Sequence, residues 1–246
     1  MTNKYMYFVA NWKMYGNLSS LNTLDKVIKF SKSKEIKKGR LIYCPPYTLI
    51  SSFSKIFKNC QIAIGGQNCH ESDNYGPYTG SVNARMLKNI GAHFVIIGHS
   101  ENRQKGENDK LINLKIKSAL QAKLKIIFCI GETLNEKKNN NTQLILSKQI
   151  KVGLNGIKNK SAIFIAYEPV WAIGSGIIPD SMDLLKTIRF IKSKFKGKIP
   201  KVLYGGSVNP QNIKNLKEIN NIDGFLIGGA SQNTNKFIDI VKKTYS

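Results

Sequence analysis

A single glutamate stands where a buried strand is expected to end. The apolar run 162–167 predicts a strand covered on both faces, and Glu168 follows it directly. Pro169 cannot continue the strand, and residues 170–176 combine an aromatic side chain, small residues and two glycines, a composition typical of a loop that moves as one piece. A lone carboxylate beneath such a loop has the arrangement of a catalytic base under a lid. The alternative interpretation is a hydrogen-bonded strand-end carboxylate beside an ordinary loop.

Other polar groups with possible chemistry also follow predicted strands. Asn11 and Lys13 come after the apolar run 5–10, although Lys13 could equally be one of the many solubilising lysines of this chain. His99 lies at the end of the fourth predicted strand and precedes Ser100, an expected helix N-cap. The positive partial charge of a helix N-terminus favours neutral imidazole, which can donate a hydrogen bond to a developing oxyanion. A purely structural histidine is the alternative.

Paired glycines close the last two predicted strands, in Tyr204-Gly205-Gly206-Ser207 and Gly228-Gly229-Ala230-Ser231. Glycines at such positions let backbone N–H groups approach an anion, and phosphate sites of (β/α)8 barrels lie at the loops after strands seven and eight. The glycines could instead only relieve crowding. A phosphate site, one carboxylate base, one neutral histidine, one lysine and a lid together indicate proton abstraction next to a carbonyl on a small phosphorylated substrate. The sequence has no nucleophile with an adjacent base and no nucleotide-binding motif.

These groups require strands that end on a common face. Continuous apolar runs predict strands at 5–10, 40–44, 61–65, 93–98, 125–130, 162–167, 201–204 and 224–227. Helical patterns separate them, as where apolar side chains recur at helical spacing at Leu111, Leu114, Ile116, Ala119 and Leu120. Eight such units predict an α/β protein with a (β/α)8 barrel, formed as one domain over residues 1–246. An open doubly wound sheet, the alternative, usually has a glycine fingerprint after its first strand, where this chain has Asn11-Trp12-Lys13-Met14.

A long segment, residues 67–80, follows the third predicted strand. Loops of this length are uncommon in compact domains unless they are functional. We therefore expect an arm that contacts a partner subunit, with disorder as the alternative.

The charge of the chain is strongly positive. Its 38 Lys and Arg residues against 15 Asp and Glu residues give a net charge of +23. The lysines are dispersed, without an arginine-rich helix or a basic-aromatic patch, which argues against specific nucleic-acid binding. A positive field of this size is expected to steer an anionic metabolite towards its site and to attract polyanions weakly.

Composition also bears on compartment and metal content. No apolar run reaches the roughly 18 residues that a membrane span needs, and the N-terminal residues read as a strand rather than a signal sequence. We expect a cytoplasmic protein. Four cysteines, Cys44, Cys60, Cys69 and Cys129, have no metal-type spacing and are expected to be reduced thiols rather than disulfides or zinc ligands.

Five motifs in order along the chain resemble the triosephosphate isomerase family. They are Asn11-Trp12-Lys13, Gly98-His99-Ser100-Glu101, Ala166–Gly176, Tyr204–Ser207 and Gly224–Ser231. The resemblance implies interconversion of dihydroxyacetone phosphate and D-glyceraldehyde 3-phosphate through an enediolate, without cofactor or metal. It implies that Glu168 moves the proton, His99 polarises the substrate oxygens, and Lys13 offsets negative charge while Asn11 orients the substrate. It further implies phosphate contacts from Gly174, Ser207, Gly228 and Gly229.

The same resemblance implies supporting roles around the lid. Ile173 and Leu226 would press on Glu168 and exclude water, and Trp171 would bond Glu132 when the lid shuts. In the family the hydroxyl matching Tyr204 accepts a lid N–H, but Pro179 stands at that lid position here and has no N–H.

A homodimer is also implied, with the long third loop inserted into the neighbouring subunit. Thr79 would reach towards Asn11 and Glu101 of that neighbour. The family often has an ion pair across the interface at the positions of Ser81 and Asn102, and both charges are absent here. Such a pair contributes modestly when partly exposed, so we expect the dimer to survive without it.

Two other functions compete with this one. A different phosphate-binding barrel enzyme could isomerise another sugar phosphate. A non-catalytic barrel could act as a polyanion-binding or scaffold protein because of its charge.

Overall fold

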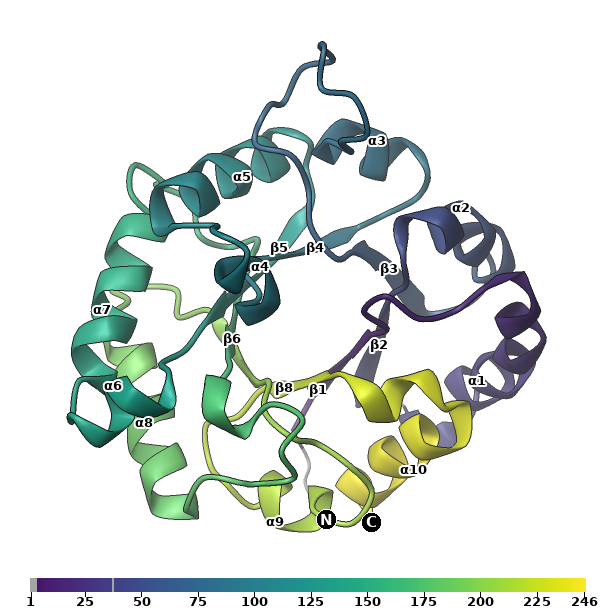
Figure 1. Ribbon diagram of the computed structural model, residues 1–246. Coiled ribbons are helices and arrows are strands. Elements are labelled where there is room, and N and C mark those ends of the chain that lie inside the picture. Colours follow the sequence, from purple (N-terminus) through teal and green to yellow (C-terminus); the bar gives the residue numbers. More distant parts are fainter. Residues whose placement is uncertain (1–3, 37) are drawn as a thin grey trace.

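Eight parallel strands close into a barrel in this computed structural model, which describes residues 4–36 and 38–246 (Figure 1). The strands neighbour one another in chain order, and β8 pairs with β1 to complete the ring. The prediction of a (β/α)8 barrel is confirmed. The open-sheet alternative is wrong, because an open sheet leaves its two outer strands unpaired.

The strands agree with the apolar runs to within one residue at each end. Their bounds are β1 (Met6–Asn11), β2 (Gly39–Cys44), β3 (Ile62–Gly66), β4 (Phe94–Ile97), β5 (Lys125–Ile130), β6 (Ile163–Tyr167), β7 (Lys201–Tyr204) and β8 (Gly224–Ile227).

The helices form an outer ring around the strands (Figure 1). Their bounds are α1 (Leu24–Ser31), α2 (Tyr47–Ile56), α3 (Ala84–Asn89), α4 (Ser100–Gln104), α5 (Asp109–Gln121), α6 (Leu134–Lys138), α7 (Thr142–Gly153), α8 (Ser181–Ser193), α9 (Ile213–Lys217) and α10 (Thr234–Tyr245). Short 3-10 turns are η1 (Leu18–Thr23), η2 (Lys34–Ile36), η3 (Val170–Ala172) and η4 (Gly229–Gln232). None of the helices in the described ranges is long and apolar enough to cross a bilayer.

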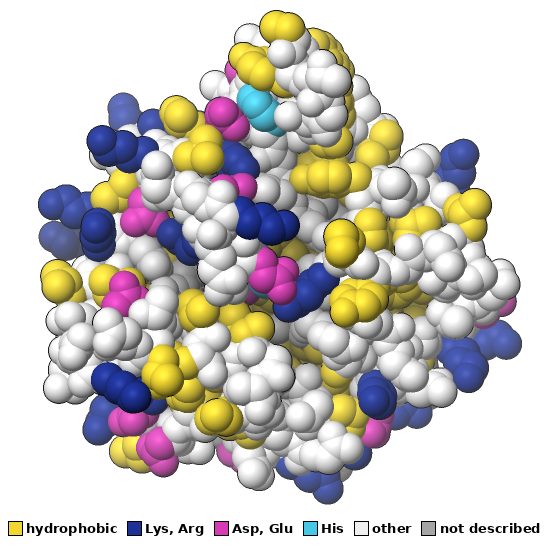
Figure 2. All heavy atoms as spheres, in the orientation of Figure 1, with side chains coloured by type: hydrophobic (Ala, Val, Ile, Leu, Met, Phe, Trp, Pro, Cys, Tyr) yellow, Lys and Arg dark blue, Asp and Glu magenta, His cyan; other side chains and the backbone are white. Residues whose placement is uncertain are grey.

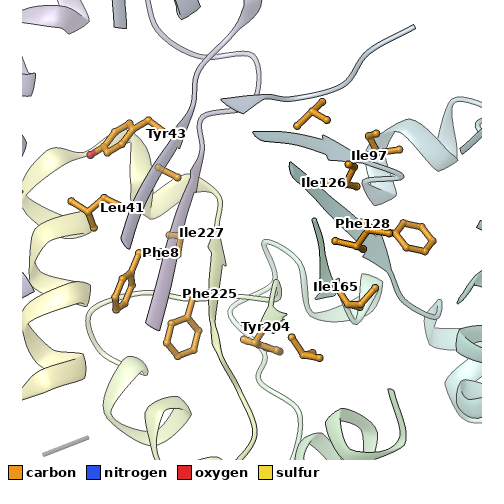
Figure 3. Packing of buried hydrophobic residues seen from close by; sticks show 14 of the residues in the cluster. Phe8, Leu41, Tyr43, Ile97, Ile126, Phe128, Ile165, Tyr204, Phe225 and Ile227 are labelled. Carbon is orange, nitrogen blue, oxygen red and sulfur yellow. The ribbon is translucent and has the colours of Figure 1, made fainter. Parts of the chain in front are cut away.

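Alternation along each strand divides the core into two layers. One cluster consists of buried strand residues only, such as Val9, Ile42 and Leu203, and fills the inside of the barrel. The intervening strand residues, such as Phe8 and Phe225 (Figure 3), belong to the second cluster. This cluster also contains buried side chains of the helices. Both faces of every strand are therefore buried, which explains the continuous apolar runs.

The inward face of helix α5 differs from the one that the sequence pattern predicts. Asn108 caps the helix by accepting hydrogen bonds from the N–H groups of Lys110 and Leu111. The helix is confirmed, but its inward face is centred on Ile112 and Ile116, which are fully buried, while Leu114 is 51% exposed.

A buried carboxylate, Asp223, ties together the end of the barrel at which the strands begin. Asp223 accepts the Val202 N–H at 2.9 Å and pairs with Lys192 at 2.7 Å and Lys4 at 3.3 Å. Burial acts to raise its pKa, but the hydrogen bonds from Lys192 and Val202, with the lysine charges, lower the pKa overall. The folded protein therefore holds Asp223 ionised.

We expect Asp223→Asn to lower the free energy of unfolding by about 3 kcal/mol at pH 7, because lysine ammonium groups lose a buried counter-charge. The folded-state pKa of Asp223 lies below its unfolded value of about 3.9. Its stabilisation is therefore present above that value and is lost as the pH falls through the folded pKa. Urea unfolding at pH 7 and at pH 3 measures both effects.

The half-exposed pair Asp239–Lys243, at 2.9 Å, provides the control for this experiment. Asp239→Asn is expected to change the free energy of unfolding by no more than about 0.5 kcal/mol. Equal effects of the two substitutions would contradict the assignment to Asp223.

Candidate active site

One cavity of about 390 Å³ opens at the carboxyl ends of the strands. It collects residues from β1, the loops after β4, β6 and β7, and the glycine pair after β8. The predicted site residues that line it are Asn11, Lys13, His99, Glu168, Ile173, Gly174, Ser207, Leu226, Gly228 and Gly229. Residues far apart in the sequence thus meet because parallel strands end on the same face of the barrel.

Glu168 is almost fully buried, with 2% of its surface exposed. Its Oε2 accepts the Ser100 N–H at 3.2 Å, and His99 Nε2 lies 3.3 Å from its Oε1. Within the described residues, Oε1 receives no hydrogen bond. A buried carboxylate oxygen without a donor is energetically costly and requires an explanation. A free lone pair at a cavity wall is what a proton acceptor needs.

His99 caps helix α4 with its own side chain, because its Nδ1 accepts the Glu101 N–H at 3.2 Å. The prediction that Ser100 is the N-cap is wrong: Ser100 is the first residue of the helix. A ring nitrogen that accepts a hydrogen bond carries no proton, so the imidazole is neutral and its proton lies on Nε2. His99 Nε2 lines the cavity and lies 3.3 Å from Glu168 Oε1, without a hydrogen bond between the two atoms.

Lys13 has a left-handed backbone conformation, with φ at 54°, which is uncommon outside glycine. Its N–H donates to Asn11 Oδ1 at 3.1 Å and its carbonyl accepts from Gln67 Nε2 at 2.8 Å. Its Nζ pairs with Glu101 at 2.6 Å. Partial burial acts to raise the pKa of Glu101, but the hydrogen bond from Lys13 and nearby positive charges lower it overall. Glu101 therefore stays ionised and holds the ammonium at the cavity.

Two glycines make room for Glu168. A Cβ added to Gly205 would lie 2.9 Å from Glu168 Cγ, and one added to Gly131 would lie 1.7 Å from the Glu168 carbonyl oxygen. Strands β5 and β7 can therefore approach Glu168 closely only because their following residues have no side chain.

The segment 169–176 covers one side of the cavity and is held at both ends. Trp171 Nε1 donates to Glu132 at 2.9 Å, and Tyr167 Oη lies 3.1 Å from the same carboxylate oxygen. Burial raises the pKa of Glu132, although these hydrogen bonds act in the opposite direction. At the other end, Ser207 Oγ donates to the Ala172 carbonyl at 2.8 Å and accepts the Gly176 N–H at 3.1 Å.

The fold agrees with comparisons to known proteins. The family model described as triosephosphate isomerase matches residues 6–244. The chain belongs to the triosephosphate isomerase family. Triosephosphate isomerase of Thermodesulfovibrio yellowstonii is 42% identical over 245 residues, covering 96% of this chain and 98% of that protein. That of Dictyoglomus thermophilum is also 42% identical, covering 95% and 97%. A crystal structure of triosephosphate isomerase from Bartonella henselae superimposes with a TM-score of 0.87 at 37% identity, covering 96% of this chain and 97% of that one.

Four of the residues expected from the triosephosphate isomerase resemblance lie outside the cavity wall. Glu101 forms an ion pair with Lys13, which lines the cavity. Trp171 donates to Glu132 and lies on the side of the segment 169–176 that faces away from the cavity. Tyr204 is buried behind Gly206, where an added Cβ would lie 2.2 Å from its Oη. Thr79 lies at the exposed tip of the long loop. In the described residues, no group of three or more potential metal ligands lies together.

Gly205 and Gly206, the glycine pair predicted to let backbone N–H groups approach an anion, also line the cavity. Several other lining residues were assigned no role from the sequence: Gly176, Val208, Asn209, Pro210, Gln211, Ala230 and Lys236. Lys236 could not be distinguished from the other lysines, because its relevance depends on where α10 begins.

The hydroxyl of Tyr204 is fully buried and, in the described residues, has no hydrogen-bond partner. The family has a lid N–H that donates to the matching hydroxyl. This chain has Pro179 at that lid position, and proline has no N–H to donate. The contacts between the segment 169–176 and the loop after β7 run through Ser207.

We expect Ser207→Ala to lower kcat/KM for a triose phosphate about 10-fold, because two hydrogen bonds of about 0.5–1.5 kcal/mol each are lost while the backbone N–H remains. We expect Tyr204→Phe to change it less than about twofold, because the hydroxyl that is removed has no partner. Steady-state kinetics of the two variants measure the difference. An equal loss in both variants would show that Tyr204 also holds the lid.

Proposed function

We propose that this chain interconverts dihydroxyacetone phosphate and D-glyceraldehyde 3-phosphate. Membership of the triosephosphate isomerase family supports this proposal. The observation that carries it is Glu168 Oε1, a buried oxygen without a donor, on the wall of a cavity that also contains a lysine, a neutral histidine and paired glycines.

The proposed reaction is a proton transfer between adjacent carbons. Glu168 removes a proton from the carbon next to the carbonyl, and the electrons of the broken C–H bond form a C=C bond while the carbonyl oxygen becomes negative. His99 Nε2–H donates to that oxygen, and the Lys13 ammonium stabilises its charge. Asn11 orients the substrate. His99 Nε2 passes its proton to that oxygen and takes up the proton of the hydroxyl on the first carbon, so that the negative charge moves to the second oxygen. Glu168 then returns the carbon-bound proton to the former carbonyl carbon, and the second oxygen becomes the new carbonyl, which exchanges ketone and aldehyde.

The phosphate group would occupy the opposite part of the cavity, at the backbone N–H groups of Gly174, Ser207, Gly228 and Gly229. Gly174 and Gly229 face open space, since an added Cβ at either would meet no atom within 4 Å, and both line the cavity. Ile173 of the segment 169–176 and Leu226 line the same cavity as Glu168, and with the segment held over the cavity they would exclude water from it. Exclusion of water strengthens the carboxylate as a base and protects the enediolate.

A homodimer formed through the long loop after β3, residues 67–80, is part of this proposal. The loop projects beyond the ring of helices (Figure 1), and Tyr75 and Tyr78 on it are 62% and 48% exposed. A second cavity, of about 260 Å³, adjoins the active site and is lined by Met14 and Tyr47 among others. Met14 and Tyr47, which line this cavity together, are 94% and 38% exposed, and exposed apolar side chains that lie together are typical of an interaction surface.

A dimer of this kind would place Thr79 of one subunit near Asn11 and Glu101 of the other. Ser81 and Asn102 would then meet without an ion pair, and the contact would depend on packing and neutral hydrogen bonds. We also propose that residues 1–246 form one domain, since the barrel takes its strands from residues 6 to 227. The free cysteines fit the cytoplasm, where the enzyme would serve glycolysis and gluconeogenesis.

A coupled assay of the purified protein tests the function. Rapid turnover of both triose phosphates, with other phosphorylated aldoses and ketoses converted far more slowly, is the expected result. Light scattering on the same sample is expected to give twice the chain mass of 27.6 kDa.

Absence of turnover together with salt-resistant binding of nucleic acid would instead favour the non-catalytic alternative. The lysine and arginine side chains on the cavity face are spread rather than gathered in one patch (Figure 2), which gives that alternative no support.

A further inference from the structure

A lysine on the last helix, Lys236, lines the active-site cavity together with Asn209 and Gln211 of the loop after β7. It lies in the first turn of α10, two residues after the start of the helix at Thr234. The glycine pair and η4 directly precede this helix. Lys236 therefore belongs to the part of the cavity that is proposed to hold phosphate, not to the part formed by Glu168 and His99.

The backbone that carries Lys236 is well anchored. Asn233 caps α10 by accepting the Lys236 N–H at 3.0 Å, and the neighbouring Phe237 is fully buried in the core. Further along the helix, the Lys243 ammonium donates to the Pro210 carbonyl at 3.2 Å. This contact ties α10 to the loop that forms the facing cavity wall. The exposed side chain of Lys236 thus starts from a fixed position at the cavity mouth.

The two lysines that line the cavity, Lys13 and Lys236, differ in whether a carboxylate neutralises their charge. Lys13, the other lysine that lines the cavity, is paired with Glu101 at 2.6 Å. In the described residues, the Lys236 ammonium has no carboxylate within ion-pair distance and no hydrogen-bond acceptor. Lys236 is thus a lining cation whose charge no protein carboxylate compensates.

A phosphate monoester carries a charge close to −2 at neutral pH. Backbone N–H groups of glycines supply dipoles for it but no net charge. We propose that Lys236 supplies the cation that attracts and holds the substrate phosphate, as an additional binding residue of the isomerase site. This proposal rests on the proposed function, because it assumes a phosphorylated substrate in this cavity.

Since Lys236 is exposed, its contribution is expected to be modest and sensitive to salt. It acts on the group that binds and not on the carbon that reacts, so it affects KM and the rate of association more than kcat. The alternative is an ordinary solvated lysine that happens to lie at the rim.

Lys236→Gln and a matched control, Lys198→Gln, distinguish the two. Lys198 is exposed and lies before β7, at the opposite end of the barrel, and its substitution removes the same charge. At low ionic strength we expect Lys236→Gln to raise KM for a triose phosphate about 3–5-fold with kcat within about twofold, and Lys198→Gln to match the wild type. The effect should shrink towards unity at about 0.5 M KCl, and Lys236→Arg should restore the wild-type KM.

Binding of inorganic phosphate, measured by calorimetry, separates this proposal from the isomerase assignment. Its Kd is expected to rise about 3–5-fold in Lys236→Gln, with or without turnover of the wild-type enzyme. An inactive wild type would overturn the assigned reaction but leave this test intact. Equal phosphate affinity in Lys236→Gln and Lys198→Gln would overturn the role of Lys236.

Discussion

Glu168→Asp is expected to lower kcat by about 10²–10³-fold, the largest loss that a conservative change should cause in this protein. Aspartate keeps the carboxylate but shortens the side chain by one methylene, so the oxygen withdraws from the substrate carbon. The backbone of residue 168 is held by a hydrogen bond from its N–H to the Ile130 carbonyl at 2.8 Å and cannot follow. The surrounding core does not change, and KM is expected to vary little. Steady-state kinetics in both directions measure this effect.

Glu168→Gln provides the control for folding. It keeps the length of the side chain but cannot accept the proton, so turnover should be lost to a similar or greater extent. Its thermal midpoint should be no lower than that of the wild type, because a buried charge with one unpartnered oxygen is replaced by a neutral group. Near-normal turnover in either variant would show that another group is the base.

Lys13→Ala is expected to lower kcat/KM by about 10²–10³-fold, as does the loss of a single charge-stabilising donor at other active sites. The substitution removes the ammonium from the cavity and leaves the Glu101 carboxylate without its partner. The unpaired Glu101 carboxylate would then repel the oxyanion that develops on the substrate, which raises the barrier of the reaction. The left-handed backbone at this position is also less favourable for alanine than for glycine.

Two further variants separate charge from structure at Lys13. Glu101→Gln removes the paired carboxylate but keeps the ammonium, and it should cost far less activity than Lys13→Ala. Lys13→Gly relieves the backbone strain but lacks the charge, so its activity should stay as low as that of Lys13→Ala. Recovery of activity in Lys13→Gly would assign the loss to backbone geometry rather than to charge.

The architecture of the barrel could be predicted from the sequence because each strand is buried on both faces. Such strands appear as unbroken apolar runs, for example 125–130, whose bounds match β5 without error. Helices are harder to assign to a face when lysines and isoleucines alternate, as in α5, where Leu114 faces solvent and Ile112 faces the core. In that helix the local pattern allowed more than one inward face, and packing against the neighbouring elements chose among them.

The positions of the site residues were also predictable in part. Asn11, Glu168 and Gly228 each follow a strand, and the ends of parallel strands in a barrel share one face. Their motifs were sufficient to bring them into one cavity. Lys236 and Gln67 were missed because one is a lysine among many and the other contributes through hydrogen bonds to backbone carbonyls.

The sequence by itself determined the number of strands, their order and the residue types at their ends, because these depend on hydrophobic runs and on single residues such as Pro169. Only the tertiary structure decided which atoms are free and which are bonded. The imidazole of His99 is neutral because its Nδ1 accepts a backbone N–H from Glu101, and Glu168 keeps one oxygen unpartnered because Ser100 bonds only the other. Hydrogen bonds and ion pairs depend on distances of a few ångströms between residues remote in the chain, and no local pattern encodes those distances.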